Sequence, residues 1–204
     1  MNETDNDNPP AGVKARWRAR MKAGRAAISA QQRVLEAAAL TEAVAGTAAT
    51  TMCCYVPFGS EPGSIALLDI LRERGTRVLL PVVPAEPAPL DWAEYTGTSA
   101  LAKGNLRPVL EPQGPRLGPK AIGEADVVLV PALAVDRSGV RLGRGAGYYD
   151  RSLSLASPTA ELVAVIRDTE FVDQLPAEPH DVRMTAVLTP SSGLRRLPSI
   201  EPSL

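Results

Sequence analysis

A glycine-rich segment near residue 145 carries the residues best suited to chemistry. Gly143, Gly145 and Gly147 alternate with other residues in the run Arg-Leu-Gly-Arg-Gly-Ala-Gly-Tyr-Tyr-Asp, which spans residues 141–150. Glycines allow a tight turn that brings backbone amides close to a ligand, and consecutive amides of this kind bind anions. Arg141 and Arg144 add guanidinium groups that match phosphate geometry. The segment therefore predicts a phosphate-binding turn.

Two common nucleotide-binding motifs do not fit this segment. A Walker loop ends in Gly-Lys-Ser/Thr, and a dinucleotide fingerprint needs Gly-x-Gly-x-x-Gly directly after a strand. A tight turn with nothing bound is the alternative, because short glycine motifs are weak signals. Two arginines, two tyrosines and an aspartate in one stretch favour binding. Residues 148–153 can begin a helix whose N-terminus faces the same anion.

Other charged and aromatic residues are candidates with ordinary alternatives. Lys14, Arg18, Lys22 and Arg25 follow spacings of four, four and three, which alone indicates a solvated helix face. Glu61 lies in a Gly/Pro/Ser-rich turn and could simply be a turn former. His180, the single histidine, could be a general base or a surface residue. Trp92 could form an aromatic wall, although half-buried packing is commoner.

The elements that position these residues follow from hydrophobic periodicity. A first helix is expected to end at Ser29, where Ser29 and Gln32 form a capping box that begins a second helix running to about residue 47. A third helix is expected over residues 64–74. Apolar strands are expected at 51–56, 77–83, 127–135, 162–166 and 185–188, with a bend at Pro131. Residues 84–89 and 104–119 are predicted loops. Uniformly apolar strands between helices predict a three-layer α/β domain with a mostly parallel central sheet flanked by helices.

Composition sets the broad class. The chain has 204 residues, 45% of them apolar, and a formal net charge of -1. The length suits one compact domain or two small ones, and the charge argues against nucleic-acid or membrane partners. The pattern along the chain places one domain over residues 12–190, between tails at 1–11 and 191–204. The polar N-terminus is no secretory signal, so the cytoplasm is expected. Adjacent Cys53 and Cys54 should point to opposite sheet faces as buried thiols.

The stretch from residue 130 to 151 resembles the signature of the 5-formyltetrahydrofolate cyclo-ligase family, also called methenyltetrahydrofolate synthetase. That signature reads approximately Pro-Gly-x-x-Phe-Asp-x-x-Gly-x-Arg-Leu-Gly-x-Gly-x-Gly-Tyr-Tyr-Asp. The matching positions are Pro131, Asp136, Gly139, Arg141, Leu142, Gly143, Gly145, Gly147, Tyr148, Tyr149 and Asp150. Ala132 and Val135 depart from it, and Ala146 fills a variable position. The resemblance extends from about residue 14 to 189 and is weak over 84–120.

The resemblance implies an ATP- and magnesium-dependent conversion of 5-formyltetrahydrofolate to 5,10-methenyltetrahydrofolate, with ADP and phosphate as products. It implies that Arg144 and Tyr148 act in catalysis and that Val56, Glu61, Arg144 and Tyr148 contact the folate. The ATP-binding residues it implies are Lys14, Arg18, Arg141, Gly143, Arg144, Gly145, Ala146, Gly147, Tyr148 and Tyr149. It implies that the carboxylates of Asp150 and Asp181 bind magnesium.

Lys22 and Arg25 have no such match and are interpreted as part of a solvated face. No obligate protein partner is indicated. A phosphosugar isomerase-like α/β enzyme and a non-catalytic nucleotide- or folate-binding relative are the alternatives.

Overall fold

The structure is a computed structural model that describes residues 10–105, 108–179 and 181–198. Within them, a central sheet has the strand order β12-β11-β9-β6-β1-β2-β3. Its inner strands are mutually parallel: β1 Thr51–Cys53, β2 Arg77–Val82, β6 Val127–Pro131, β9 Glu161–Val165 and β11 Ala186–Thr189. The edge strands β3 Asp91–Glu94 and β12 Gly193–Arg196 run antiparallel to their neighbours.

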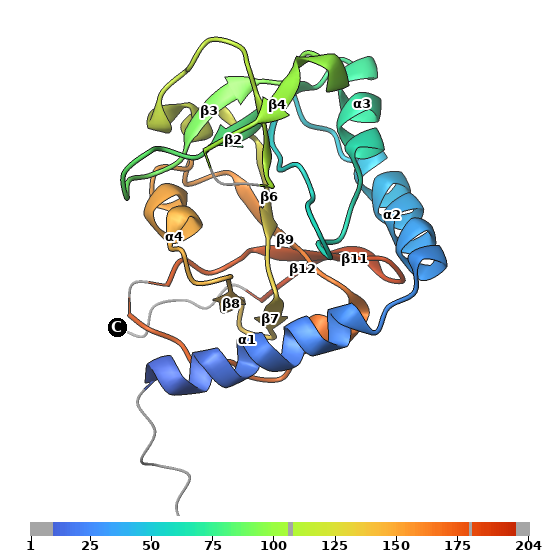
Figure 1. Ribbon diagram of the computed structural model, residues 1–204, viewed down its shortest axis with the longest axis vertical. Coiled ribbons are helices and arrows are strands. Elements are labelled where there is room, and N and C mark those ends of the chain that lie inside the picture. The colour runs from blue at the N-terminus through green and yellow to red at the C-terminus, as the bar shows by residue number, and fades with distance from the viewer. Residues whose placement is uncertain (1–9, 106–107, 180, 199–204) are drawn as a thin grey trace, which may run out of the picture.

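Two hydrophobic cores cover the two faces of this sheet. Helices α2 Ala30–Ala45 and α3 Ile65–Glu73 pack on one face, and α4 Tyr148–Leu153 and the 3-10 helix η2 Pro119–Glu124 pack on the other (Figure 1). Apolar side chains alternate between the cores, so Val128 faces α4 while Leu129 faces α2 and α3. The three-layer α/β prediction is thereby confirmed.

A smaller sheet beside the central one was not expected. It has the order β10-β7-β8 and consists of β7 Ala134–Asp136, β8 Arg141–Leu142 and β10 Phe171–Val172. Helix α1 Pro10–Ala26 lies across it, and Met21 packs against Leu133 and Leu142 in a third core (Figure 1). The predicted bend at Pro131 is the point where β6 ends before β7 leaves the main sheet. The bend thus carries the chain toward the glycine-rich segment.

The remaining short elements correct several sequence expectations. The strand expected over 51–56 ends at Cys53, and the loop expected at 104–119 contains β5 Leu110–Pro112, which pairs with β4 Leu101–Lys103. The 3-10 helices η1 Thr98–Ala100 and η3 Asp168–Glu170 were not predicted. The tail expected from residue 191 instead includes β12, because its backbone completes the edge beside β11. Such strands are too short and too polar for hydrophobic periodicity to indicate.

Two further expectations can be compared with the structure. Cys53 and Cys54 are buried free thiols that pack into opposite cores, as predicted. No helix in the described part of the chain is long and apolar enough to cross a membrane. The cytoplasmic location stays a prediction.

Candidate active site

A cleft opens at the carboxyl ends of β1, β2 and β6. Val56 follows β1, Val83 follows β2, and Ala132 follows β6, and all three line the cleft. The β1–β2 connection contains α3 and the β6–β9 connection contains α4, which lie on opposite faces of the sheet. Doubly wound sheets bind ligands at such a switch point, outside the carboxyl ends of the strands. The cleft therefore occupies the position where this architecture binds small molecules.

The glycine-rich segment forms one wall of the cleft. Residues 143–147 and the tyrosines that follow them all line it. Gly145 and Gly147 have φ angles of 105° and 72°, a left-handed region that other residues adopt at a cost. Gly143 accepts a hydrogen bond at its carbonyl from Arg18 Nε, 3.1 Å away. Helix α1 thus holds the turn from outside, and the turn itself requires its glycines.

Arg144 reaches from this turn to the opposite wall. Its Nε lies 2.9 Å from Glu61 Oε1, and its guanidinium carbon lies 4.3 Å from the centre of the Phe58 ring. The ion pair and the cation–π contact join the glycine turn to the turn that follows β1. The sequence placed Arg144 and Glu61 on separate turns, and the structure brings their side chains into contact. Phe58 was missed, although it lies only three residues before Glu61.

Glu61 is held in a defined orientation and a dry environment. Its side chain is only 5% exposed, and its Oε2 accepts a hydrogen bond from the Phe58 amide at 3.2 Å. Burial raises the pKa of the Glu61 carboxyl above its ordinary value, while the charge of Arg144 opposes this effect. Such a carboxylate suits a ligand whose edge carries several N–H donors.

The two tyrosines of the turn differ in their surroundings. Tyr148 lies under the guanidinium of Arg151, with 5.3 Å between that group and the ring centre. Tyr149 Oη and Arg141 Nε are buried without a hydrogen-bond partner in the described structure, and both residues line the cleft. Buried polar atoms are rarely left unpaired, and because both residues line the cleft, these two atoms are available to a ligand there.

Lys14 and Arg18, expected at the ATP phosphates, stand at the outer side of the turn. Lys14 pairs with Glu178 at 2.7 Å and with Asp181 at 3.3 Å, and these carboxylates raise the pKa of its ammonium group despite the opposing effect of burial. Arg18 contacts Gly143, as described above. Neither side chain lines the cleft, and of the two only Arg18 contacts the glycine turn in the described structure.

The two carboxylates expected at magnesium are each engaged by a cation. Asp150 Oδ1 pairs with Arg141, and Asp181 Oδ2 accepts from Lys14 Nζ and from the amide of Glu178. Among the described residues, no hydrogen bond reaches Asp150 Oδ2 or Asp181 Oδ1, and no group of three or more metal-binding side chains occurs. Magnesium prefers hard oxygens and keeps several waters or phosphate oxygens as ligands. Each carboxylate thus keeps one oxygen available to a metal ion, and the magnesium assignment stays a prediction.

One interpretation from the sequence is wrong, and one needs a change of degree. Arg25, assigned to a solvated helix face, is 1% exposed and lines the cleft, because α1 continues the basic stripe into the protein interior. Trp92 packs in the core on the α4 face, as favoured over an aromatic wall, but it is completely buried rather than half-buried. Lys22 is exposed, as expected for a solvated face. His180 lies outside the described residues.

The fold and the cleft define a doubly wound α/β protein with a charged small-molecule site. Comparisons with known proteins show the family to which it belongs. Residues 10–190 match the 5-formyltetrahydrofolate cyclo-ligase family. A protein named 5-formyltetrahydrofolate cyclo-ligase from Mycolicibacterium smegmatis is 60% identical, over 71% of this chain and 75% of its own length. A protein of the same name from Escherichia coli K12 is 32% identical, over 70% of this chain and 79% of its own length. The chain belongs to this family and is a ligase.

Solved structures show the same fold. A 5,10-methenyltetrahydrofolate synthetase from Aquifex aeolicus superposes with a TM-score of 0.75 at 23% identity, covering 94% of this chain and 96% of the other. The corresponding protein from Mycoplasma pneumoniae gives a TM-score of 0.67 at 18% identity, covering 85% and 96%. At these identities the likeness concerns the architecture.

Proposed function

We propose that the protein uses ATP to convert 5-formyltetrahydrofolate into 5,10-methenyltetrahydrofolate, ADP and phosphate in the cleft. The observation that carries this proposal is the Arg144–Glu61 pair, which joins a phosphate-type glycine turn to a buried carboxylate across one cavity. A reaction between a phosphate donor and a heterocycle rich in N–H donors needs these two kinds of group within reach of each other. The unpaired Tyr149 hydroxyl and Arg141 Nε add polar atoms for a ligand.

The chemical difficulty lies in the formyl group on nitrogen 5, an unreactive amide whose oxygen leaves poorly. In the proposed route the formyl oxygen attacks the γ-phosphorus of ATP, and ADP departs. Nitrogen 10 then attacks the activated carbon, the carbon–oxygen bond breaks, and phosphate leaves as nitrogen 10 loses its proton. The protein must align the formyl oxygen with the γ-phosphorus and neutralise charge.

Glu61 is proposed to accept hydrogen bonds from the amino and ring N–H groups of the pterin, with Val56 beside it in the cleft wall. The pterin edge would then replace the guanidinium of Arg144 at this carboxylate. Arg144 is released toward the glycine turn from which it projects, where its planar donors suit the γ-phosphoryl oxygens. Tyr148 contributes at the same wall.

Lys14 and Arg18 are proposed to support the phosphate chain from α1, and the backbone amides of residues 143–147 to bind it directly. Asp150 and Asp181 would hold magnesium through their available oxygens. When bound, this ion neutralises charge on the phosphate oxygens. Activity should disappear in the presence of a chelator and return when magnesium is added. Full activity in metal-free buffer would remove these two residues from the proposal.

The decisive experiment follows the near-ultraviolet absorbance of methenyltetrahydrofolate. Purified protein with 5-formyltetrahydrofolate, ATP and magnesium should produce this absorbance, and omission of ATP should abolish it. ADP and phosphate measured in the same mixture should each equal the methenyl product. Absence of product with all three components present would contradict the proposed reaction.

A further inference from the structure

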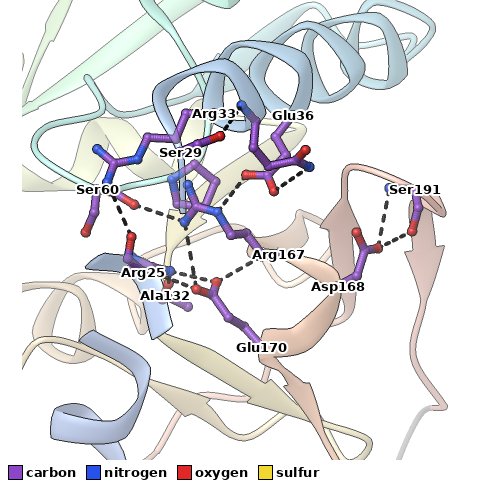
Figure 2. A network of polar contacts seen from close by, with 12 residues as sticks. Arg25, Ser29, Arg33, Glu36, Ser60, Ala132, Arg167, Asp168, Glu170 and Ser191 are labelled. Carbon is purple, nitrogen blue, oxygen red and sulfur yellow. Dashed lines mark hydrogen bonds and ion pairs between the residues drawn. The ribbon is translucent and has the colours of Figure 1, made fainter. Parts of the chain in front are cut away.

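A buried cluster of charges lies directly behind the Glu61 turn. It consists of Arg25 on α1, Glu36 on α2, and Arg167 and Glu170 at the carboxyl end of β9, and is called the arginine network below (Figure 2). Arg25 and Arg167 are 1% and 3% exposed, and Glu170 is 3% exposed. The two guanidinium groups face two carboxylates, and Arg33 on α2 donates to the Arg25 carbonyl beside them.

Arg25 and Glu170 form its lower half. Arg25 Nε and Nη2 lie 2.6 and 2.8 Å from the two oxygens of Glu170, a bidentate arrangement. Arg25 Nη2 also donates to the Ala132 carbonyl, where the chain leaves β6 at the floor of the cleft. This half fixes the end of α1 to the bend that leads to the glycine-rich segment.

Arg167 forms the upper half and connects three separate segments. Its Nε donates to Glu36 at 2.7 Å, and its Nη1 donates to the Ser60 carbonyl at 3.0 Å, as Figure 2 shows. The same Nη1 lies 3.8 Å from Glu170. Ser60 immediately precedes Glu61, so this hydrogen bond is directed at the backbone of the turn that carries the buried carboxylate.

We propose that Arg167 is a positioning residue that orients Glu61 for the pterin by holding the Ser60 carbonyl. This inference rests on the proposed folate reaction and adds a residue outside the cleft lining to it. Within the turn, the Phe58 amide donates to the Glu61 side chain, the Glu61 amide donates to the Phe58 carbonyl, and Tyr55 Oη donates to the Pro62 carbonyl. Arg144 is released when folate binds, whereas Arg167 ties the turn to α2 and to the end of β9. Arg167 remains attached throughout, because its partners lie on α2 and at the end of β9.

The chemistry of arginine suits this role. Its planar guanidinium presents donors in fixed directions, so one side chain can engage Glu36 and the Ser60 carbonyl together. Lysine is a single flexible point charge and cannot reproduce both contacts in the same geometry. Burial makes the arrangement costly to disturb, since a carboxylate left without its partner in the interior is strongly destabilising.

The test compares Arg167→Lys with Glu36→Gln in the full chain. Glu36→Gln alters the same network but leaves the Arg167–Ser60 contact in place, so it is the matched control. Calorimetry should show the Kd for 5-formyltetrahydrofolate rising about tenfold in Arg167→Lys, the scale of losing one hydrogen bond to a charged group. The Kd for ATP alone should stay near that of the parent protein, and kcat at saturating folate should be little changed. Glu36→Gln should keep both Kd values.

A double variant keeps the inference testable if Arg167→Lys does not fold. Glu36→Met with Arg167→Met removes both charges of the upper pair, and such apolar replacement of a buried pair is often tolerated. It should show the same selective loss of folate affinity. Unchanged folate affinity in either Arg167 variant would overturn the inference, as would an equal loss for folate and ATP. If the parent protein itself does not bind 5-formyltetrahydrofolate, the proposed function fails instead.

Discussion

At the scale of single residues, the contact between Arg144 and Glu61 defines the site. Arg144 is 38% exposed in its side chain and projects from a glycine turn, whereas Glu61 is nearly buried. The arginine can therefore move once a ligand takes its place at the buried carboxylate, while Glu61 stays in place. This asymmetry makes Arg144 the group that changes partner during the proposed reaction and Glu61 the fixed recognition point.

Replacement of Arg144 should damage catalysis more than binding. If its guanidinium stabilises the γ-phosphoryl group during transfer, Arg144→Ala lowers kcat by about 100-fold or more, the scale for losing one preorganised donor. Arg144→Lys should recover only part, because a point charge cannot replace the planar group. Steady-state kinetics with varied ATP measures both. A normal kcat with only a raised KM for ATP would show uniform phosphate binding and remove Arg144 from the catalytic residues.

The pH dependence of folate binding should reveal the ionisation of Glu61. Burial raises the pKa of this carboxyl, and Arg144 is the main influence that lowers it. The proposed binding of the pterin needs the ionised form, so affinity should fall as the pH drops through this raised pKa. Arg144→Ala removes the lowering influence, and the loss should then begin at a higher pH. Titration calorimetry across the acidic range, with Arg144→Lys as the charge-preserving control, tests this. Identical profiles for the alanine variant and the parent would contradict it.

At the scale of elements, the glycine turn depends on its backbone angles. Gly147 ends the turn at φ 72°, and a Cβ placed there would lie 2.8 Å from Arg151 Nη1. The Arg151 side chain in turn donates to the Ala146 carbonyl at 3.1 Å, and this hydrogen bond stabilises the start of α4. A side chain at position 147 therefore strains the backbone and displaces the Arg151 side chain from this hydrogen bond.

Gly147→Ala should lower the free energy of unfolding by about 1–2 kcal/mol, the cost of a left-handed alanine, and weaken ATP binding. Gly24→Ala is the control, since Gly24 is exposed in α1 and its Cβ would meet nothing within 4 Å. That change should raise the free energy of unfolding by about 0.5–1 kcal/mol. Urea denaturation and ATP calorimetry on both variants measure the difference. A neutral effect at position 147 would show that the turn tolerates other conformations.

Sequence patterns predicted the elements whose signal is local. Apolar runs indicated β1, β2, β6, β9 and β11, and the Ser29 cap indicated the start of α2, where its side chain accepts from the Gln32 amide. The edge strand β12 pairs with β11 across a short hairpin, but it is polar and mostly exposed, so its composition does not indicate a strand. Arg25 was misassigned for a different reason: its partner Glu170 is 145 residues away. The Arg144–Glu61 contact likewise becomes visible only in three dimensions.

At the scale of the whole molecule, the layered architecture isolates both cysteines from solvent. Cys53 and Cys54 follow one another at the centre of the sheet and face different cores. Burial raises the pKa of both thiols, so the reactive thiolate is scarce at neutral pH.

Both thiols should therefore resist a thiol reagent in the native protein and react together when the domain unfolds. Mass spectrometry after timed exposure to iodoacetamide, across a series of urea concentrations, should show modification that follows global unfolding. The unfolded chain in high urea is the positive control. Fast labelling of either thiol without denaturant would mean that one helical layer opens locally while the rest stays folded.

The Arg144–Glu61 pair also has a thermodynamic consequence for the two substrates. In the proposed reaction folate displaces Arg144 from Glu61, and ATP gains the guanidinium that this displacement releases. Each substrate then lowers the cost of binding the other, which is positive cooperativity without a second subunit. Linkage requires the enhancement to be equal in both directions: the factor by which folate tightens a non-hydrolysable ATP analogue equals the factor by which that analogue tightens folate.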